Sequence, residues 1–189
     1  YRRDSLDAQT VARIANIFNN NRQFTDAIDV TECYRLSDTT SVDVNRQNAK
    51  AYCMLKDYKK AIERYESLKR MGDRSFLTFY YLGISYYGDN WFYGSYDNLK
   101  EAYAKNSTDI NVLYYYAKSC SRTSWKKEGV EFMEKAVEIA TPGDSILERL
   151  YKGLAECYGY AGESYKKIEV MNRLYKLNKD YKLFYSIAR

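Results

Sequence analysis

The chain contains no histidine, and this absence limits the chemistry that its other reactive side chains could perform. Serine, cysteine and metal catalysis usually recruit histidine as a base or a ligand. The four cysteines, Cys33, Cys53, Cys120 and Cys157, form no C-x-x-C pair, and each lies within a helical pattern. Cysteine in such a place usually behaves as a small buried hydrophobe. We therefore predict structural thiols and no metal site, while disulfide pairing stays open because the sequence does not reveal the compartment.

Carboxylates are the remaining candidates for catalysis. Glu131, Glu134 and Glu138 share one helical face, and a pair of acids could cleave a glycosidic bond. They interleave with Lys127 and Lys135, so we interpret them as a solvated helix face. The phosphate-binding patterns G-x-x-x-x-G-K-[ST] and G-x-G-x-x-G are also missing. We therefore predict that the chain has no catalytic residue, binds no cofactor and is not an enzyme.

Small residues recur every 34 positions, and they define the elements that must position any functional side chain. One series is Ala27, Ala61, Ser95 and Gly129. Two parallel series have the same period: Ala15, Ala49, Gly83 and Ala117, and Phe18, Tyr52, Tyr86 and Cys120. A period of 34 residues is typical of stacked helix-turn-helix units. Proline occurs once, so long helices are permitted.

The repeat predicts one array of about five helical pairs. A lengthened connection, Thr141-Pro142-Gly143-Asp144, delays the fifth unit by four residues. The expected units are 8–41, 42–75, 76–109, 110–147 and 148–180, followed by a terminal helix at 181–189 that we interpret as a cap rather than the start of another unit. The expected helices are 7–20, 23–37, 42–55, 58–71, 75–88, 91–105, 109–122, 125–140, 144–160 and 163–178.

Two motifs carry a resemblance to a known family. Phe79-x-x-Leu82-Gly83-x-x-Tyr86 has the form W-x2-L-G-x2-Y, and Ala61-x3-Tyr65 has the form A-x3-F. Over about residues 7–189 the chain resembles the tetratricopeptide repeat (TPR) family. The resemblance implies an all-α, right-handed superhelix in which the first helix of each pair lines a concave groove.

The second unit departs from the pattern, because Asn45 and Asn48 are polar at positions that should face the core. Either that helix packs loosely or the two asparagines find buried partners.

The resemblance also implies a set of groove residues on the first helices. Tyrosines and cations dominate these positions, and rigid aromatic rings beside cations are typical of binding hot spots. The alternative is that they solvate the helices and pack between neighbours. A known subtype of the family grips a terminal carboxylate with lysine and asparagine, but Ala12 replaces the first lysine, so we predict no such clamp. The predicted ligand-binding residues are Arg46, Lys50, Tyr80, Tyr81, Tyr87, Tyr114, Tyr115, Lys118, Arg122, Lys152 and Tyr160.

The leading hypothesis is a protein-interaction scaffold that binds a protein or peptide with acidic and apolar side chains. Glycan binding at the aromatic turn Trp91-Phe92-Tyr93 and nucleic-acid binding by stacked tyrosines are the alternatives. The net charge of +5 and pI near 8.8 are weaker than a nucleic-acid footprint requires. No apolar run is long enough to predict a transmembrane segment. Because the sequence begins at Tyr1 without a leader, cytoplasmic and exported locations both stay open, as do flanking domains, oligomeric state and the ligand's identity.

Overall fold

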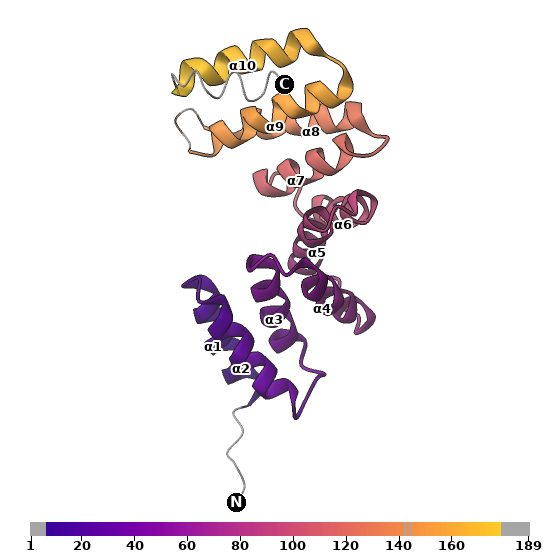
Figure 1. The fold of residues 1–189 in the computed structure, drawn as a ribbon. Helices are drawn as coiled ribbons and strands as arrows, with labels where there is room; N and C mark the ends of the chain where they lie inside the picture. Colours follow the sequence, from indigo (N-terminus) through magenta and orange to yellow (C-terminus); the bar gives the residue numbers. More distant parts are fainter. Residues whose placement is uncertain (1–6, 142, 144, 179–189) are drawn as a thin grey trace, which may run out of the picture. The chain divides into compact units, whose positions relative to one another are not determined.

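The computed structural model describes residues 7–141, 143 and 145–178, and the regular elements in this part of the chain are ten helices in consecutive antiparallel pairs (Figure 1). The expected all-α solenoid of helical pairs is confirmed, and every helix end lies within two residues of its expected position. The terminal helix expected at 181–189 lies outside the described residues, as do Pro142 and Asp144. The helices are α1 (Ala8–Asn20), α2 (Phe24–Arg35), α3 (Val42–Met54), α4 (Tyr58–Arg70), α5 (Phe76–Gly88), α6 (Phe92–Lys105), α7 (Ile110–Ser121), α8 (Lys126–Ile139), α9 (Ile146–Ala161) and α10 (Ser164–Asn178).

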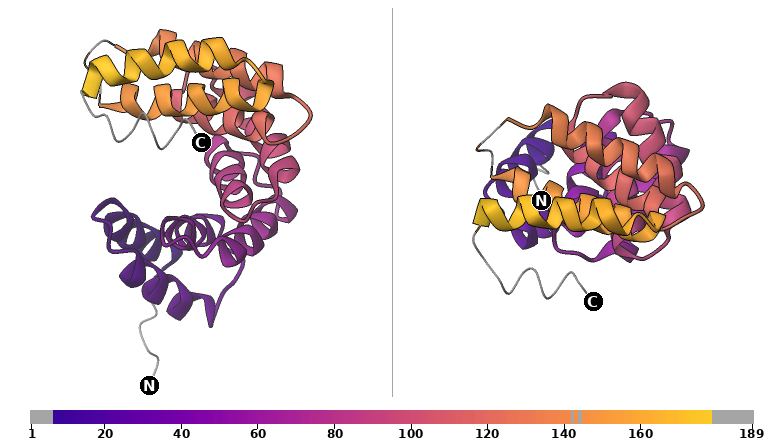
Figure 2. Two further views of the ribbon diagram at one scale, coloured as in Figure 1. Left: turned by 45° about the horizontal axis from the view of Figure 1, so that its top comes forward. Right: turned by 90° about the horizontal axis from the view of Figure 1, so that it is seen from above.

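The helices fall into two compact units. Unit 1, Tyr1–Trp91, contains α1 to α5, and unit 2, Phe92–Arg189, contains α6 to α10. Within each unit, every helix packs against the next one along the chain, as α9 and α10 do in Figure 2. In addition, the first helices of neighbouring pairs contact each other, namely α1 with α3, α3 with α5 and α7 with α9.

Polar caps start the first helices of the first four pairs at the same 34-residue interval. The side chains of Asp7, Ser41, Ser75 and Asp109 each accept a hydrogen bond from the backbone N–H three residues later. Such caps satisfy a backbone donor that the helix itself leaves unpaired. The 34-residue period of the sequence is therefore also the spacing between the starts of these first helices.

The turns inside the first three pairs share an unusual backbone conformation. Arg22, Lys56 and Asn90 have φ of 60°, 64° and 62°, in the left-handed region that residues other than glycine rarely adopt. In each turn, the following N–H donates to the carbonyl five residues earlier, at 2.8–3.0 Å, which satisfies the end of the first helix. Gly162, with φ of 79°, takes the corresponding place between α9 and α10.

Small residues lie where the two helices of a pair cross. Ala27 and Ala61 are fully buried in unit 1, and Gly129 is buried in unit 2, where Ser95 of α6 is buried against Ser119 of α7, with their hydroxyl oxygens 2.7 Å apart. Around them, larger side chains fill two separate cores: Tyr65, Leu68 and Leu82 are among the residues of the first, and Leu113, Met133 and Leu150 of the second. Small side chains at the crossings let the backbones approach, so they set the spacing of each pair.

The two unexpected asparagines of α3 both find hydrogen-bond partners, and one partner of Asn48 is buried. Asn48 is fully buried and donates to Thr31 Oγ1 at 2.9 Å and to Glu32 Oε1 at 3.0 Å. Its Oδ1 accepts from Arg64 Nε at 3.2 Å. Asn45 donates to the carbonyl oxygen of Thr39 at 2.7 Å. The polar positions of unit 1 therefore form a hydrogen-bonded network that joins α2, α3 and α4.

Candidate functional site

In unit 2, side chains of α7 and α9 meet along one surface. The Arg149 guanidinium donates to Asn111 Oδ1 at 2.6 Å and lies 4.7 Å from the centre of the Tyr114 ring. Further along, Lys118 forms an ion pair with Glu156. These pairs join equivalent positions of neighbouring first helices, so the repeat itself brings them together. We call this surface the α7–α9 face; its residues are Asn111, Tyr114, Lys118, Arg122, Arg149, Glu156 and Tyr160.

Arg122 stands out on the α7–α9 face. Its side chain follows the last turn of α7, and its guanidinium carbon lies 4.2 Å from the centre of the Phe92 ring and 5.5 Å from that of Tyr160. Cation–π attraction of this kind restrains the side chain without neutralising its charge. Arg122 is exposed, and among the described residues no carboxylate forms an ion pair with it. The face therefore presents an ordered positive charge between two rings.

The other predicted residues of unit 2 already have partners. Lys118 is largely covered, with 14% of its side chain exposed, and pairs with Glu156. Lys152 pairs with Glu148 one turn away on α9. Tyr115 packs edge-on against Tyr114, with ring centres 5.2 Å apart. These contacts hold the face in shape, and Arg122 and the half-exposed Tyr160 are its most accessible predicted members.

In unit 1, Arg46 serves as a brace between elements. Its guanidinium pairs with Asp43 at 2.8 Å and with Asp73, in the turn between α4 and α5, at 2.9 Å. Asp73 also accepts from Thr78 Oγ1 at 2.7 Å. Burial by itself would raise the pKa of Asp73, but the hydrogen bonds from Thr78, Ser75 and Arg46 outweigh it, and the pKa lies below its usual value. Arg46 is thus engaged in fixing α3 to the next pair.

The remaining predicted residues of unit 1 lie within packing contacts. Tyr80 stacks on Phe76 at 5.7 Å, and Tyr81 stacks on the fully buried Tyr65 at 6.2 Å. Burial lowers the pKa of Lys50, whose ammonium lies 3.5 Å from Asn20 Oδ1. Tyr87 is half-buried on α5.

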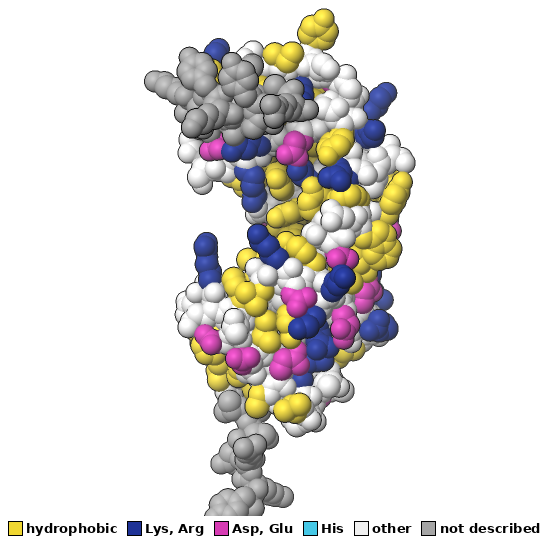
Figure 3. All heavy atoms as spheres, in the orientation of Figure 1, with side chains coloured by type: hydrophobic (Ala, Val, Ile, Leu, Met, Phe, Trp, Pro, Cys, Tyr) yellow, Lys and Arg dark blue, Asp and Glu magenta, His cyan; other side chains and the backbone are white. Residues whose placement is uncertain are grey.

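The structure thus places the eleven predicted residues in two groups, one on each unit. Figure 3 shows that Lys and Arg side chains intermingle with Asp and Glu over unit 1, so this face carries no continuous basic patch.

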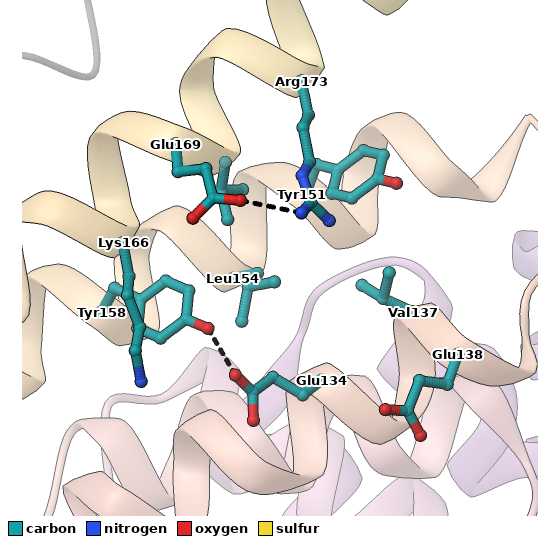
Figure 4. Close-up of a pocket in the computed structure, with 10 residues that line it drawn as sticks. Glu134, Val137, Glu138, Tyr151, Leu154, Tyr158, Lys166, Glu169 and Arg173 are labelled. Atoms are coloured by element: carbon teal, nitrogen blue, oxygen red, sulfur yellow. Dashed lines mark hydrogen bonds and ion pairs between the residues drawn. The ribbon is translucent and has the colours of Figure 1, made fainter.

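A cavity of about 410 Å³ lies among α8, α9 and α10 of unit 2, and the sequence did not indicate it (Figure 4). Glu134, interpreted from the sequence as part of a solvated face, is half-buried there and accepts a hydrogen bond from the Tyr158 hydroxyl. Burial and this bond raise the pKa of Tyr158. We call this site the α8–α10 cavity; it is lined by Glu134, Val137 and Glu138 of α8, Tyr151, Leu154 and Tyr158 of α9, and Lys166, Glu169, Val170 and Arg173 of α10.

The four cysteine thiols differ in their exposure to solvent. Cys53, Cys120 and Cys157 are buried, whereas Cys33 is exposed on α2, and all four are free. Burial raises the pKa of Cys53 and of Cys157 to about 11, which keeps these thiols protonated near neutral pH. In the described part of the chain, no three residues of the types His, Cys, Asp and Glu gather as a metal site would require. Nor does that part include a helix with the length and apolar character needed to cross a bilayer.

Tandem helical pairs, a 34-residue period and small residues at the crossings define a helical-repeat protein with the TPR fold. No family model and no curated protein matches the sequence.

Solved structures match the fold. YrrB, described as a TPR protein with an unusual peptide-binding site, superposes with a TM-score of 0.78 at 17% identity, over 94% of this chain and 89% of its own. MamA from Desulfovibrio magneticus RS-1 gives 0.77 at 15% identity, over 91% and 95%. TPR-like repeats of a kinesin light chain from Podospora anserina give 0.68 at 14%, over 91% and 97%.

Proposed function

We propose that this chain is a non-catalytic scaffold for protein interactions, and that unit 2 binds a peptide or protein segment on the α7–α9 face. The observation that carries the proposal is Arg122, an ordered and exposed cation between two aromatic rings without a carboxylate partner among the described residues. A guanidinium held in this way is prepared to bind a carboxylate, because little side-chain freedom remains to be lost on binding.

The chemistry of the face suggests the kind of segment that it would bind. A carboxylate of the segment would pair with Arg122, and an apolar side chain beside it would cover the exposed ring of Tyr160. Arginine and tyrosine are the residue types that most often dominate binding energies at interfaces. The peptide-binding site named for YrrB, a protein of the same fold, is consistent with this use of the fold but does not locate the site.

The five predicted residues of unit 1 have weaker support as binding residues. Arg46 is tied to two aspartates, and the rings of Tyr80 and Tyr81 pack on neighbouring rings. Glycan or nucleic-acid binding by stacking also has less support, because Trp91 of the aromatic turn packs edge-on against Tyr86 with ring centres 4.6 Å apart, and Phe92 lies against the Arg122 guanidinium. We therefore restrict the proposal to the α7–α9 face of unit 2. The residues predicted from the sequence that lie in unit 2 are Tyr114, Tyr115, Lys118, Arg122, Lys152 and Tyr160.

Selection from a displayed library of random peptides tests the proposal. We expect the immobilised chain to enrich peptides that carry Asp, Glu or a free C-terminal carboxylate next to an apolar residue. Fluorescence anisotropy with an enriched peptide should show a loss of at least about tenfold in affinity for Arg122→Ala, the size expected for a hot-spot arginine. Tyr160→Ala should also weaken binding, because it removes one of the two rings beside Arg122.

Arg70→Ala is the matched control. Arg70 is also exposed, and its replacement by alanine removes the same charge, but it lies on α4 in unit 1. If Arg70→Ala weakened binding as much as Arg122→Ala, only net charge would matter and the α7–α9 face would be the wrong site. Enrichment of peptides that show no preference for a carboxylate would contradict the role of Arg122 directly.

A further inference from the structure

Two carboxylates of α8, Glu134 and Glu138, face the α8–α10 cavity one helical turn apart (Figure 4). Like charges at this spacing repel each other. Within the described residues, neither carboxylate forms an ion pair; Glu134 Oε1 accepts from the neutral hydroxyl of Tyr158, and Glu138 has no partner. No described cation forms an ion pair with either carboxylate, although the Lys166 ammonium attracts Glu134 at longer range.

The nearby cations are engaged elsewhere. Lys135, on α8 itself, donates to Tyr103 Oη at 2.9 Å and lies 5.0 Å from the centre of that ring. Of the two cations that line the cavity, Lys166 pairs with Glu163 at 2.7 Å. The other, Arg173, pairs with Glu169 at 2.8 Å, as Figure 4 shows. Lys166 and Arg173 are each balanced by a carboxylate three or four residues away, and Lys135 forms no ion pair with a described carboxylate, so neither Glu134 nor Glu138 has an ion-pair partner in the described chain.

The cavity also has an apolar floor. Val137, Leu154 and Val170 line it, and Leu154 and Val170 are each only 5% exposed. A site with an apolar base and carboxylates at one side fits a side chain with an aliphatic stem and a cationic end. Among such side chains, arginine has the planar group whose N–H donors match carboxylate oxygens two at a time.

We propose that the α8–α10 cavity binds an arginine side chain of a partner protein. The guanidinium pairs with Glu138 and with the second oxygen of Glu134, while its aliphatic stem packs on Leu154 and Val137. This site is distinct from the α7–α9 face, which presents a cation. Unit 2 thus has two sites of opposite charge preference, one for an acidic segment and one for a basic segment.

Methyl NMR spectroscopy of the full chain tests this proposal with a defined probe. The peptide acetyl-Ala-Arg-Ala-amide should shift the methyl resonances of Val137, Leu154 and Val170, with an affinity in the millimolar range expected for one charged side chain. The same peptide with citrulline, a neutral isostere of arginine, should leave these resonances unshifted at equal concentration. Equal shifts from both peptides would overturn the proposal, as would the absence of any shift from the arginine peptide.

Matched substitutions on α8 locate the effect. Glu138→Gln should weaken binding of the arginine peptide by at least about fivefold, because it removes one of the two charges that hold the guanidinium. Glu131→Gln, on the same helix but outside the cavity, should leave the affinity unchanged. Both positions are exposed, so neither substitution disturbs the core. Equal affinities for Glu138→Gln and the unsubstituted chain would overturn the proposal.

Discussion

At Gly129, the backbone of α8 passes very close to α7. A Cβ atom added there would lie 2.8 Å from the carbonyl oxygen of Ala117 and 2.4 Å from Ser121 Oγ. The carbonyl oxygen is part of the backbone and cannot rotate away. Gly159, in α9, differs, because the nearest atom to an added Cβ is Lys167 Cδ at 3.7 Å, an ordinary contact. The two helical glycines are therefore there for different physical reasons.

We expect the same substitution to have opposite effects at these two positions. Gly129→Ala should lower the free energy of unfolding by about 1–3 kcal/mol, because the added methyl overpacks the helix crossing. Gly159→Ala should raise it by up to about 1 kcal/mol, because alanine favours the helix. Urea unfolding followed by circular dichroism measures both.

The comparison is informative because Ala27 and Ala61 occupy the positions equivalent to Gly129. Sequence similarity among the repeats would suggest that alanine is acceptable at 129 as well. A gain in stability for Gly129→Ala would show that α7 and α8 can separate at no cost, contrary to the packing described above.

At the scale of elements, Asp73 fastens the turn between α4 and α5 to α3. Its side chain is 5% exposed and accepts hydrogen bonds from Thr78, from the Ser75 N–H and from Arg46. Because its folded pKa is lowered, its carboxylate stabilises the folded state at pH values above the unfolded pKa of about 4. That stability is lost as the pH falls below this value and through the lower folded pKa.

This linkage predicts how Arg46→Gln depends on pH. The substitution removes the charge that pairs with Asp73, so it should reduce the urea midpoint more near pH 7 than near pH 3. Near pH 3, below the unfolded pKa of about 4, protonation of the unfolded chain already removes part of the stability that the ionised Asp73 contributes. Arg70→Gln, which removes an exposed arginine of α4, should show no such pH dependence. A loss for Arg46→Gln that is equal at both pH values would mean that the aliphatic stem of Arg46, and not its charge, stabilises the turn.

Elements were more predictable from the sequence than contacts. Helix ends depend on local signals, such as the caps at Ser41 and Ser75, and these signals recur with the repeat. Ion pairs such as Arg46–Asp73 join residues 27 positions apart, and a sequence with many charges offers many alternative partners. The α8–α10 cavity was missed because its shape depends on three helices together, and no single segment contains its signal.

The candidate site was also predictable only in part, because the repeat determines which residues share a helix face but not how their side chains pair. The repeat placed Tyr114, Lys118 and Arg122 on one helix face, and the structure brings them beside α9. The repeat did not indicate that Lys118 would be paired with a carboxylate, or that Arg122 would have no such partner among the described residues. Those differences depend on which side chains α9 and the first turn of α6 supply.

At the scale of the whole molecule, each unit has its own hydrophobic core. The core of unit 2 includes Leu113, Met133 and Leu150, and all of its members lie between Tyr103 and Met171. In helical-repeat proteins, stability is approximately a sum over neighbouring elements, so a part with a complete core can fold alone. Whether the five pairs act as one continuous array stays a prediction.

We therefore expect residues 92–189 to fold as an isolated fragment. Far-UV circular dichroism should show a helical spectrum and a cooperative urea transition. A fragment of residues 110–189 should be less stable, because it lacks the α6 rings of Tyr96 and Tyr103, which pack on Tyr116. A non-cooperative transition for residues 92–189 would show that unit 2 depends on unit 1 for its fold.

The left-handed turns at Arg22, Lys56 and Asn90 have a consequence for engineering. Each holds a residue with a Cβ in a conformation that glycine adopts freely, so Arg22→Gly and Lys56→Gly should each raise the free energy of unfolding by about 0.5–1 kcal/mol. The turns are far apart in sequence and share no hydrogen bonds, so thermal melting of the double variant should show nearly additive gains. Unit 1, stabilised in this way, could tolerate costly substitutions among its own helices. The repeat would then provide a robust scaffold for evolving new binding specificities.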